Sequence, residues 1–166
     1  MTRYVGLDLS TKTGIVVLDE QGSILRQSEV KKTIKENPGD MYDLILDVTK
    51  LVGPEDVVVM EGFGFASKTG FLLGGIGWGV RMELWKRNIP YYLAAPTALK
   101  KFATGSGVAD KRKLAVAVNN KWGFFDDSDN VTDAYILAQM ARAIGGHEKI
   151  NKVQQTVLKK VTKVSE

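Results

Sequence analysis

The stretch YVGLDLSTKTGIVVLD, residues 4–19, decides the fold class. It contains most of two apolar runs, residues 3–9 and 13–19, that have the length and composition of β-strands. Residues 23–30 form a third, weaker run. Asp19-Glu20-Gln21-Gly22 supplies turn residues between the second and third runs. The first 30 residues are therefore predicted to form an antiparallel meander.

Helical patterns then alternate with short apolar strands. The helical patterns cover residues 39–52, 67–87, 96–103, 111–121 and 129–142. Two apolar runs between them, residues 56–61 and 89–93, have the composition of buried strands that are flanked by helices. Together with the meander they predict an α/β fold whose mixed sheet has five strands, three antiparallel and two parallel, with helices on its faces.

The C-terminal residues differ in character from the rest of the chain. Residues 148–164 place apolar side chains on one side of a Lys-rich helical pattern. We therefore predict one domain over residues 1–145, followed by a basic amphipathic helix or tail over residues 146–166. Such a tail can pack on the domain, on a partner subunit or on DNA. It lacks the aromatic anchors of a membrane-surface helix.

Length and composition limit the class of protein. A chain of 166 residues can bury one substantial core, and 44% hydrophobic with 25% charged residues is typical of a soluble globular protein. No apolar run has the length of a membrane span, and the first residues do not form a signal peptide. The absence of cysteine fits a reducing compartment. We expect a cytoplasmic protein with no membrane partner.

Positive charge is concentrated in two segments. Residues 86–113 contain seven Lys or Arg and a single acidic residue, and residues 146–166 contain five Lys against two Glu. Solvated helix faces can account for such segments. Basic segments that flank a buried acidic cluster instead predict a polyanionic partner, and we favour this interpretation for residues 100–113.

Three carboxylates stand where apolar segments end or are interrupted. Asp8 interrupts the first strand, Glu61 directly follows Val-Val-Val-Met at 57–60, and Asp133 begins an apolar-rich helical run. A charge at the end of a buried strand is costly unless something compensates it, so three of them suggest a shared cation. Oxygen ligands suit Mg²⁺ or Mn²⁺, whereas a single His and no Cys argue against zinc.

Four segments resemble the motifs of RuvC-type Holliday-junction resolvases, in the order and spacing of that family. They are Gly6-Leu7-Asp8-Leu9-Ser10-Thr11-Lys12-Thr13-Gly14, Val58-Val59-Met60-Glu61-Gly62-Phe63, the basic segment over residues 96–111, and Asp129-Asn130-Val131-Thr132-Asp133-Ala134. The resemblance extends from about residue 3 to about residue 143, and a phage-encoded member is one form of it. It implies an RNase H-like fold, a homodimer, and Mg²⁺- or Mn²⁺-dependent nicking of opposed strands in four-way DNA junctions.

The resemblance also implies roles for individual residues. Asp8, Glu61 and Asp133 match the family's metal ligands, which hold two ions per active site. Three positions before the last Asp the family usually has another acidic residue, and this chain has Asn130. An amide oxygen can bind a hard cation without adding charge. We therefore predict Asn130 as the fourth ligand and keep the adjacent Asp129 as its substitute.

The resemblance places basic and aromatic residues on DNA. Lys100 and Lys111 match residues that can contact the scissile phosphate and stabilise its transition state. Further DNA contacts are predicted for Lys68, Lys101 and Arg112. Phe63 and Phe65 follow Glu61, where the family has an aromatic residue that stacks on bases at the centre of the junction. Either Phe suits this role, and both also suit a core position.

Other functions remain compatible with the same residues. A related nuclease that acts on forks, flaps or RNA would keep the chemistry and change the substrate. Residues 8–14 also resemble the phosphate loop of actin-like nucleotide-binding proteins, although those need a second lobe. A DNA-binding protein with an inactive site is a third class, against which the three carboxylates argue. Trp78, Met82 and Trp85 share a helical face and suit either a core or a dimer contact.

Overall fold

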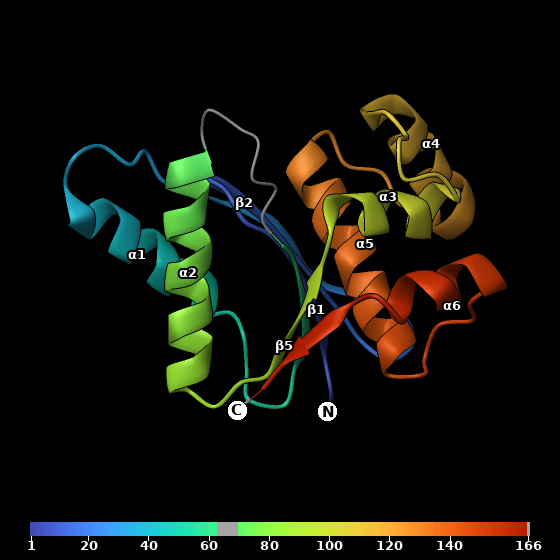
Figure 1. Ribbon diagram of the computed structural model, residues 1–166, viewed down its shortest axis with the longest axis horizontal. Helices are drawn as coiled ribbons and strands as arrows, with labels where there is room; N and C mark the ends of the chain where they lie inside the picture. Colours follow the sequence, from blue (N-terminus) through green and yellow to red (C-terminus); the bar gives the residue numbers. More distant parts are fainter. Residues whose placement is uncertain (63–69, 166) are drawn as a thin grey trace.

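The protein is described by a computed structural model that covers residues 1–62 and 70–165. Its centre is a mixed sheet with the strand order β3-β2-β1-β4-β5-β6 (Figure 1). The strands are β1 (Tyr4–Asp8), β2 (Lys12–Leu18), β3 (Ile24–Lys31), β4 (Val57–Glu61), β5 (Tyr91–Ala94) and β6 (Thr162–Val164). The predicted meander is confirmed, because β2 pairs antiparallel with both β1 and β3. The two parallel pairings join β1 to β4 and β4 to β5.

Helices cover both faces of the sheet (Figure 1). One layer contains α1 (Pro38–Thr49) and α2 (Gly70–Lys86). The other contains α3 (Pro96–Thr104), α4 (Lys111–Trp122), α5 (Asp129–Ile144) and α6 (Lys152–Leu158). Each layer has its own hydrophobic core against the sheet, so the central strands are buried on both faces. No helix in the described part of the chain is long and apolar enough to cross a membrane.

Alternation along the central strands decides which layer each side chain meets. Val5 and Leu7 of β1 belong to the core with α1 and α2. Gly6 therefore faces the opposite layer, and so does Asp8 two residues later. In β4 the same rule directs Val59 into the core of α5 and places Glu61 on that face.

The α5 helix lies directly on the backbone of β1 and β2. A methyl group on Gly6 would overlap the carbonyl oxygen of Ala134, and one on Gly14 would overlap the carbonyl oxygen of Asn130. Only glycine at these two strand positions leaves room for the helix. The two glycines therefore set the distance between the first turns of α5 and the ends of β1 and β2.

The C-terminal segment departs from the predicted structure. The helix expected over residues 148–164 is limited to α6, and residues 162–164 form β6, which pairs antiparallel with β5. The prediction of five strands was therefore one strand short. Gln154 of α6 donates to the carbonyl oxygen of Phe102 at 3.1 Å, and Val157 is buried. Burial of one polar and one apolar side chain against α3 fixes this segment to the sheet and its helices.

Candidate active site

The three predicted carboxylates meet where β1, β4 and α5 come together. Asp8 and Glu61 are the last residues of neighbouring parallel strands whose register pairs Leu7 with Met60. The side chains of both residues face α5, as the alternation of side chains along each strand requires. Asp133 lies on α5 one residue before Ala134, whose carbonyl group rests against Gly6. Segments distant in sequence therefore place three half-buried acids together.

Electrostatics show that the three acids are close and poorly compensated. Burial, followed by the charges of Asp133 and Glu61, raises the pKa of Asp8 to about 8. Burial and Asp133 raise the pKa of Glu61 to about 7, and burial and Asp129 raise the pKa of Asp133 to about 6. Raised values mean that the protein's own cations do not offset the cost of burying these like charges together.

A cavity of about 220 Å³ opens beside the acids. Lys100 from α3 and Lys111 from α4 stand on its wall, and its lining is Glu61, Pro96, Leu99, Lys100, Lys111, Leu114, Asp129, Thr132 and Asp133. Both lysines lower the pKa of Asp133, which places their charges within electrostatic reach of the carboxylates. An anionic group that enters this cavity would meet two ammonium groups beside the three acids.

Asp129 is engaged by Lys111 at the rim of this cavity. The Lys111 Nζ lies 2.6 Å from Asp129 Oδ2, and both side chains are largely exposed. Asp129 thus holds a lysine, which leaves Asn130 as the better candidate for a fourth ligand. The loop before Asn130 is held by Glu29 of β3, which accepts a hydrogen bond from the Ser128 hydroxyl. Sequence reasoning missed Glu29, although it lies opposite Gly14, which in turn lies opposite Asp8.

The donor set at this site fits a hard divalent cation. Three carboxylates stand at the strand ends and on α5, and their raised pKa values mark negative charge that a cation would offset. Within residues 1–62 and 70–165, no three Asp, Glu or His side chains lie close enough together to form a ready-made metal site. Asp8, Glu61 and Asp133 are therefore neighbours that a bound ion would have to draw together.

The predicted DNA contacts fall into two groups. Lys100 and Lys111 line the cavity of the acids, whereas Lys101 lines a different cavity between α3 and α6, and Arg112 lines another along α4. Lys101 and Arg112 are exposed and stay predictions as DNA contacts. Phe63, Phe65 and Lys68 lie outside the described residues.

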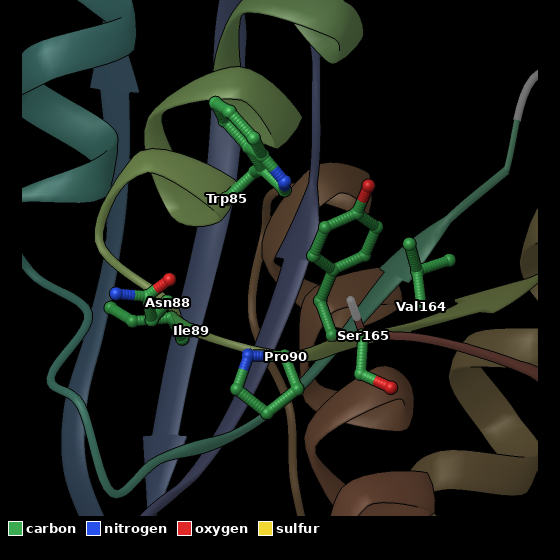
Figure 2. A pocket seen from close by; sticks show the side chains of 7 residues that line it. Trp85, Asn88, Ile89, Pro90, Val164 and Ser165 are labelled. Carbon is green, nitrogen blue, oxygen red and sulfur yellow. The ribbon is translucent and has the colours of Figure 1, made fainter.

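A larger cavity of about 810 Å³ lies away from the acids. It is bounded by the end of α2, the start of β5 and the end of β6. These segments lie at the ends of the strands that are opposite to Asp8 and Glu61. Figure 2 shows the side chains of Trp85 and Val164 on its walls, with Pro90 and Ser165 nearby. Its lining contains no Asp, Glu, His, Lys or Arg.

Comparison with known proteins gives a structural likeness alone. No protein-family model and no curated protein matches this sequence. Among solved structures, Thermus thermophilus RuvC in complex with a Holliday junction substrate is similar, with a TM-score of 0.68 and 21% identity over 90% of this chain and 99% of that one. A second Thermus thermophilus RuvC structure gives a TM-score of 0.66 and 21% identity over 89% and 98%. The chain therefore has the RNase H-like fold of RuvC, as the sequence motifs predicted.

Proposed function

We propose that this protein is a metal-dependent endonuclease that nicks opposed strands of four-way DNA junctions. The observation that carries the proposal is the meeting of Asp8, Glu61 and Asp133 beside a cavity with two lysines, in the fold of RuvC. The similar RuvC structure was obtained with a Holliday junction substrate. Three half-buried acids with raised pKa values are the kind of cluster expected at a functional site.

Asp8, Glu61 and Asp133 are the residues that would hold Mg²⁺ or Mn²⁺, with Asn130 as a neutral fourth ligand. When bound, two such ions supply an acidified attacking water and relieve the leaving oxygen of negative charge. Asp8 would be the central residue of this set, because β1 pairs with the strand that carries Glu61 and is covered by the helix that carries Asp133. The charges of both other acids also raise the pKa of Asp8.

Lys100 and Lys111 would bind the phosphate that is cut. Both ammonium groups flank the cavity from helices outside the sheet, so they can approach a phosphate that rests on the acids. As fixed positive charges they would stabilise the extra negative charge of the transition state. The ion pair with Asp129 keeps Lys111 at the rim before DNA binds.

A substrate panel tests this function directly. Cleavage of a four-way junction, a Y-fork, a flap, a linear duplex and an RNA–DNA hybrid should be measured with Mg²⁺, Mn²⁺ and EDTA. We expect fastest cleavage of the junction, and none in EDTA. Faster cutting of forks, flaps or the hybrid would assign the same chemistry to another branched or RNA substrate. Junction cleavage no faster than that of linear duplex would contradict the proposal.

The Lys100→Ala variant should slow junction cleavage by about 10- to 100-fold, because one charge that faces the scissile phosphate is lost. The salt dependence of junction binding should also weaken by about one phosphate contact. Lys50→Ala is the matched control, since its side chain is exposed and follows α1, in the helical layer on the other face of the sheet. Single-turnover rates at several salt concentrations measure both effects. Equal rates for the two variants would return Lys100 to an ordinary solvated role.

Cutting opposed strands requires two active sites, and α2 offers a surface for a second copy of the chain. Four apolar side chains lie exposed along one side of this helix: Phe71 (99%), Trp78 (58%), Met82 (60%) and Trp85 (68%). The opposite side of α2 packs on α1, where a methyl group on Gly79 would overlap Ile45. The cavity beside Trp85 extends the apolar surface toward β6 (Figure 2). An apolar stripe of this kind is typical of a protein interface.

The Trp78→Glu variant should convert the protein from dimer to monomer, because a buried, unpaired carboxylate at an interface costs several kcal/mol. Val116→Glu, an exposed apolar position on α4, is the matched control and should leave the dimer intact. Sedimentation velocity over a concentration series measures the change. A wild-type protein that sediments as a monomer at all concentrations would contradict the dimer.

A further inference from the structure

A groove of about 530 Å³ lies between α3 and α6. The two helices lie side by side (Figure 1), and α6 turns Gln154 and Val157 inward. The polar residues on the walls of this α3–α6 groove come from α3, from the loop after it and from the end of α6: Thr97, Lys101, Ser106, Thr156 and Lys160. The C-terminal segment thus completes a polar groove beside the helix that carries Lys100.

The segments that form the α3–α6 groove carry positive charge alone. Residues 95–109 contain two Lys, residues 149–165 contain five, and neither range contains Asp or Glu. All five lysines of the second range are exposed, so the packing of α6 does not account for them. Lys101 and Lys160 form no ion pair with any residue in the ranges 1–62 and 70–165. Such a surface is complementary to a polyanion.

The α3–α6 groove is separated from the cavity of the acids only by the width of α3. Lys100 lines that cavity and Lys101 lines the groove, because successive residues of a helix point about 100° apart. A helix is about 10 Å wide with its side chains, and about three base pairs of duplex DNA span this distance at about 3.4 Å each. A DNA strand that has a phosphate beside Lys100 would therefore reach Lys101 within a few nucleotides.

The lining of the α3–α6 groove suits the backbone of duplex DNA. Lys, Ser and Thr side chains are common contacts of phosphate oxygens. None of the described residues that line the groove is aromatic, so it offers no ring on which an unpaired base could stack. Ser106 also lines the cavity along α4 that contains Arg112 and Lys113, which extends the basic surface.

We propose that the α3–α6 groove binds the phosphate backbone of the duplex arm that leads away from the cleaved phosphate, with Lys101 and Lys160 as its charged contacts. The inference rests on the proposed junction-cleaving function. It also gives the C-terminal segment a role, because the pairing of β6 with β5 and the packing of α6 on α3 hold Lys160 beside the site. Contacts of this kind do not depend on the base sequence of the arm.

The test compares Lys101→Ala and Lys160→Ala with Lys50→Ala, an exposed lysine in the helical layer on the other face of the sheet. Fluorescence anisotropy with one four-way junction in EDTA is measured from about 50 to about 200 mM salt. We expect each groove variant to weaken binding by about 3- to 10-fold and to reduce the slope of log affinity against log salt by about 0.9. The double variant should reduce the slope by about two, and Lys50→Ala should match the wild type.

The binding and cleavage results together separate two kinds of failure. Equal salt slopes for Lys101→Ala, Lys160→Ala and Lys50→Ala, in a wild type that cuts the junction, would overturn the inference alone. A wild type that neither binds nor cuts the junction would overturn the proposed function and the inference with it.

A chemical probe locates the arm directly. The chain has no cysteine, so Thr156→Cys introduces a single thiol into the α3–α6 groove. An iron–EDTA group attached to this thiol cuts nearby DNA through hydroxyl radicals. We expect cuts in one duplex arm about three to six base pairs from the nicked phosphate, and no localised cuts from the same group on Lys50→Cys. Uniform or absent cutting from Thr156→Cys would place the arm elsewhere and contradict the inference.

Discussion

Asp8→Asn is expected to slow junction cleavage by at least about 100-fold, while the affinity for the junction remains within a few-fold of the wild type. The amide lowers cation affinity at the centre of the acidic cluster, where the charges of Glu61 and Asp133 both raise the pKa of Asp8. It leaves Lys100 and Lys111 in place, so the attraction to phosphate persists. Cleavage assays and fluorescence anisotropy with the same four-way junction measure the two quantities.

The same variant should be more stable than the wild type without metal. The pKa of Asp8 is raised from 3.8 to about 8, so between these values the folded chain holds a proton that the unfolded chain has lost. Stability of the metal-free wild type therefore falls as the pH rises from about 4 to about 8. Asp8→Asn removes this loss and is expected to raise the free energy of unfolding by about 1–3 kcal/mol at pH 7.5 in EDTA.

Addition of Mg²⁺ or Mn²⁺ should make the wild type more stable than Asp8→Asn, which is the reverse of their order in EDTA. A cation that binds only the folded state stabilises the wild type, and it should stabilise Asp8→Asn much less. Chemical denaturation at pH 5 and pH 7.5, with EDTA and with Mn²⁺, provides the four comparisons. Loss of junction binding in a folded Asp8→Asn protein, or a lower stability than the wild type in EDTA at pH 7.5, would contradict this account.

Gly6→Ala is expected to be strongly destabilising, because it adds a methyl group where β1 touches the backbone of α5. The new Cβ would overlap the carbonyl oxygen of Ala134 and lie 2.5 Å from the amide nitrogen of Ala138. Both atoms belong to the backbone of α5, so no side-chain rotation relieves the overlap. We expect a loss of about 3 kcal/mol or more, in the range of severe overpacking. Displacement of α5 would also carry Asp133 away from Asp8 and slow cleavage.

Gly107→Ala is the matched control for this substitution. At Gly107 the nearest atom to an added Cβ is the carbonyl oxygen of Thr97, at 3.4 Å, which is an ordinary contact. Its stability should stay within about 0.5 kcal/mol of the wild type. Urea denaturation of both variants measures the difference. A Gly6→Ala protein as stable as Gly107→Ala would show that α5 can move off β1 without cost.

The central fold was predictable because its signals are local. Alternating apolar residues in β1 and β2, turn residues at 19–22 and an uninterrupted apolar β4 each indicate their element within a few residues. The positions of Asp8 and Glu61 followed, since the ends of adjacent parallel strands meet at one edge of a sheet. Asp133 was placed with them by its family motif, and the close contact of α5 with Gly6 brings it there.

The features that were not predicted depend on contacts between distant segments. The short sequence Thr-Lys-Val at 162–164 has no strand signal of its own and becomes β6 only because β5 offers an unpaired edge. Lys111 and Asp129 are 18 residues apart, and nothing in either local sequence indicates their ion pair. The hydrogen bond between Ser128 and Glu29 likewise requires the register of β3, which the sequence pattern does not specify.

The last strand has a consequence for solubility. Without β6, the backbone groups of Tyr91, Tyr92 and Leu93 along β5 would form an open edge rich in aromatic and apolar residues, which another chain could extend by strand pairing. With β6 in place, that border is only three residues long and carries Lys163, a charge that discourages further pairing.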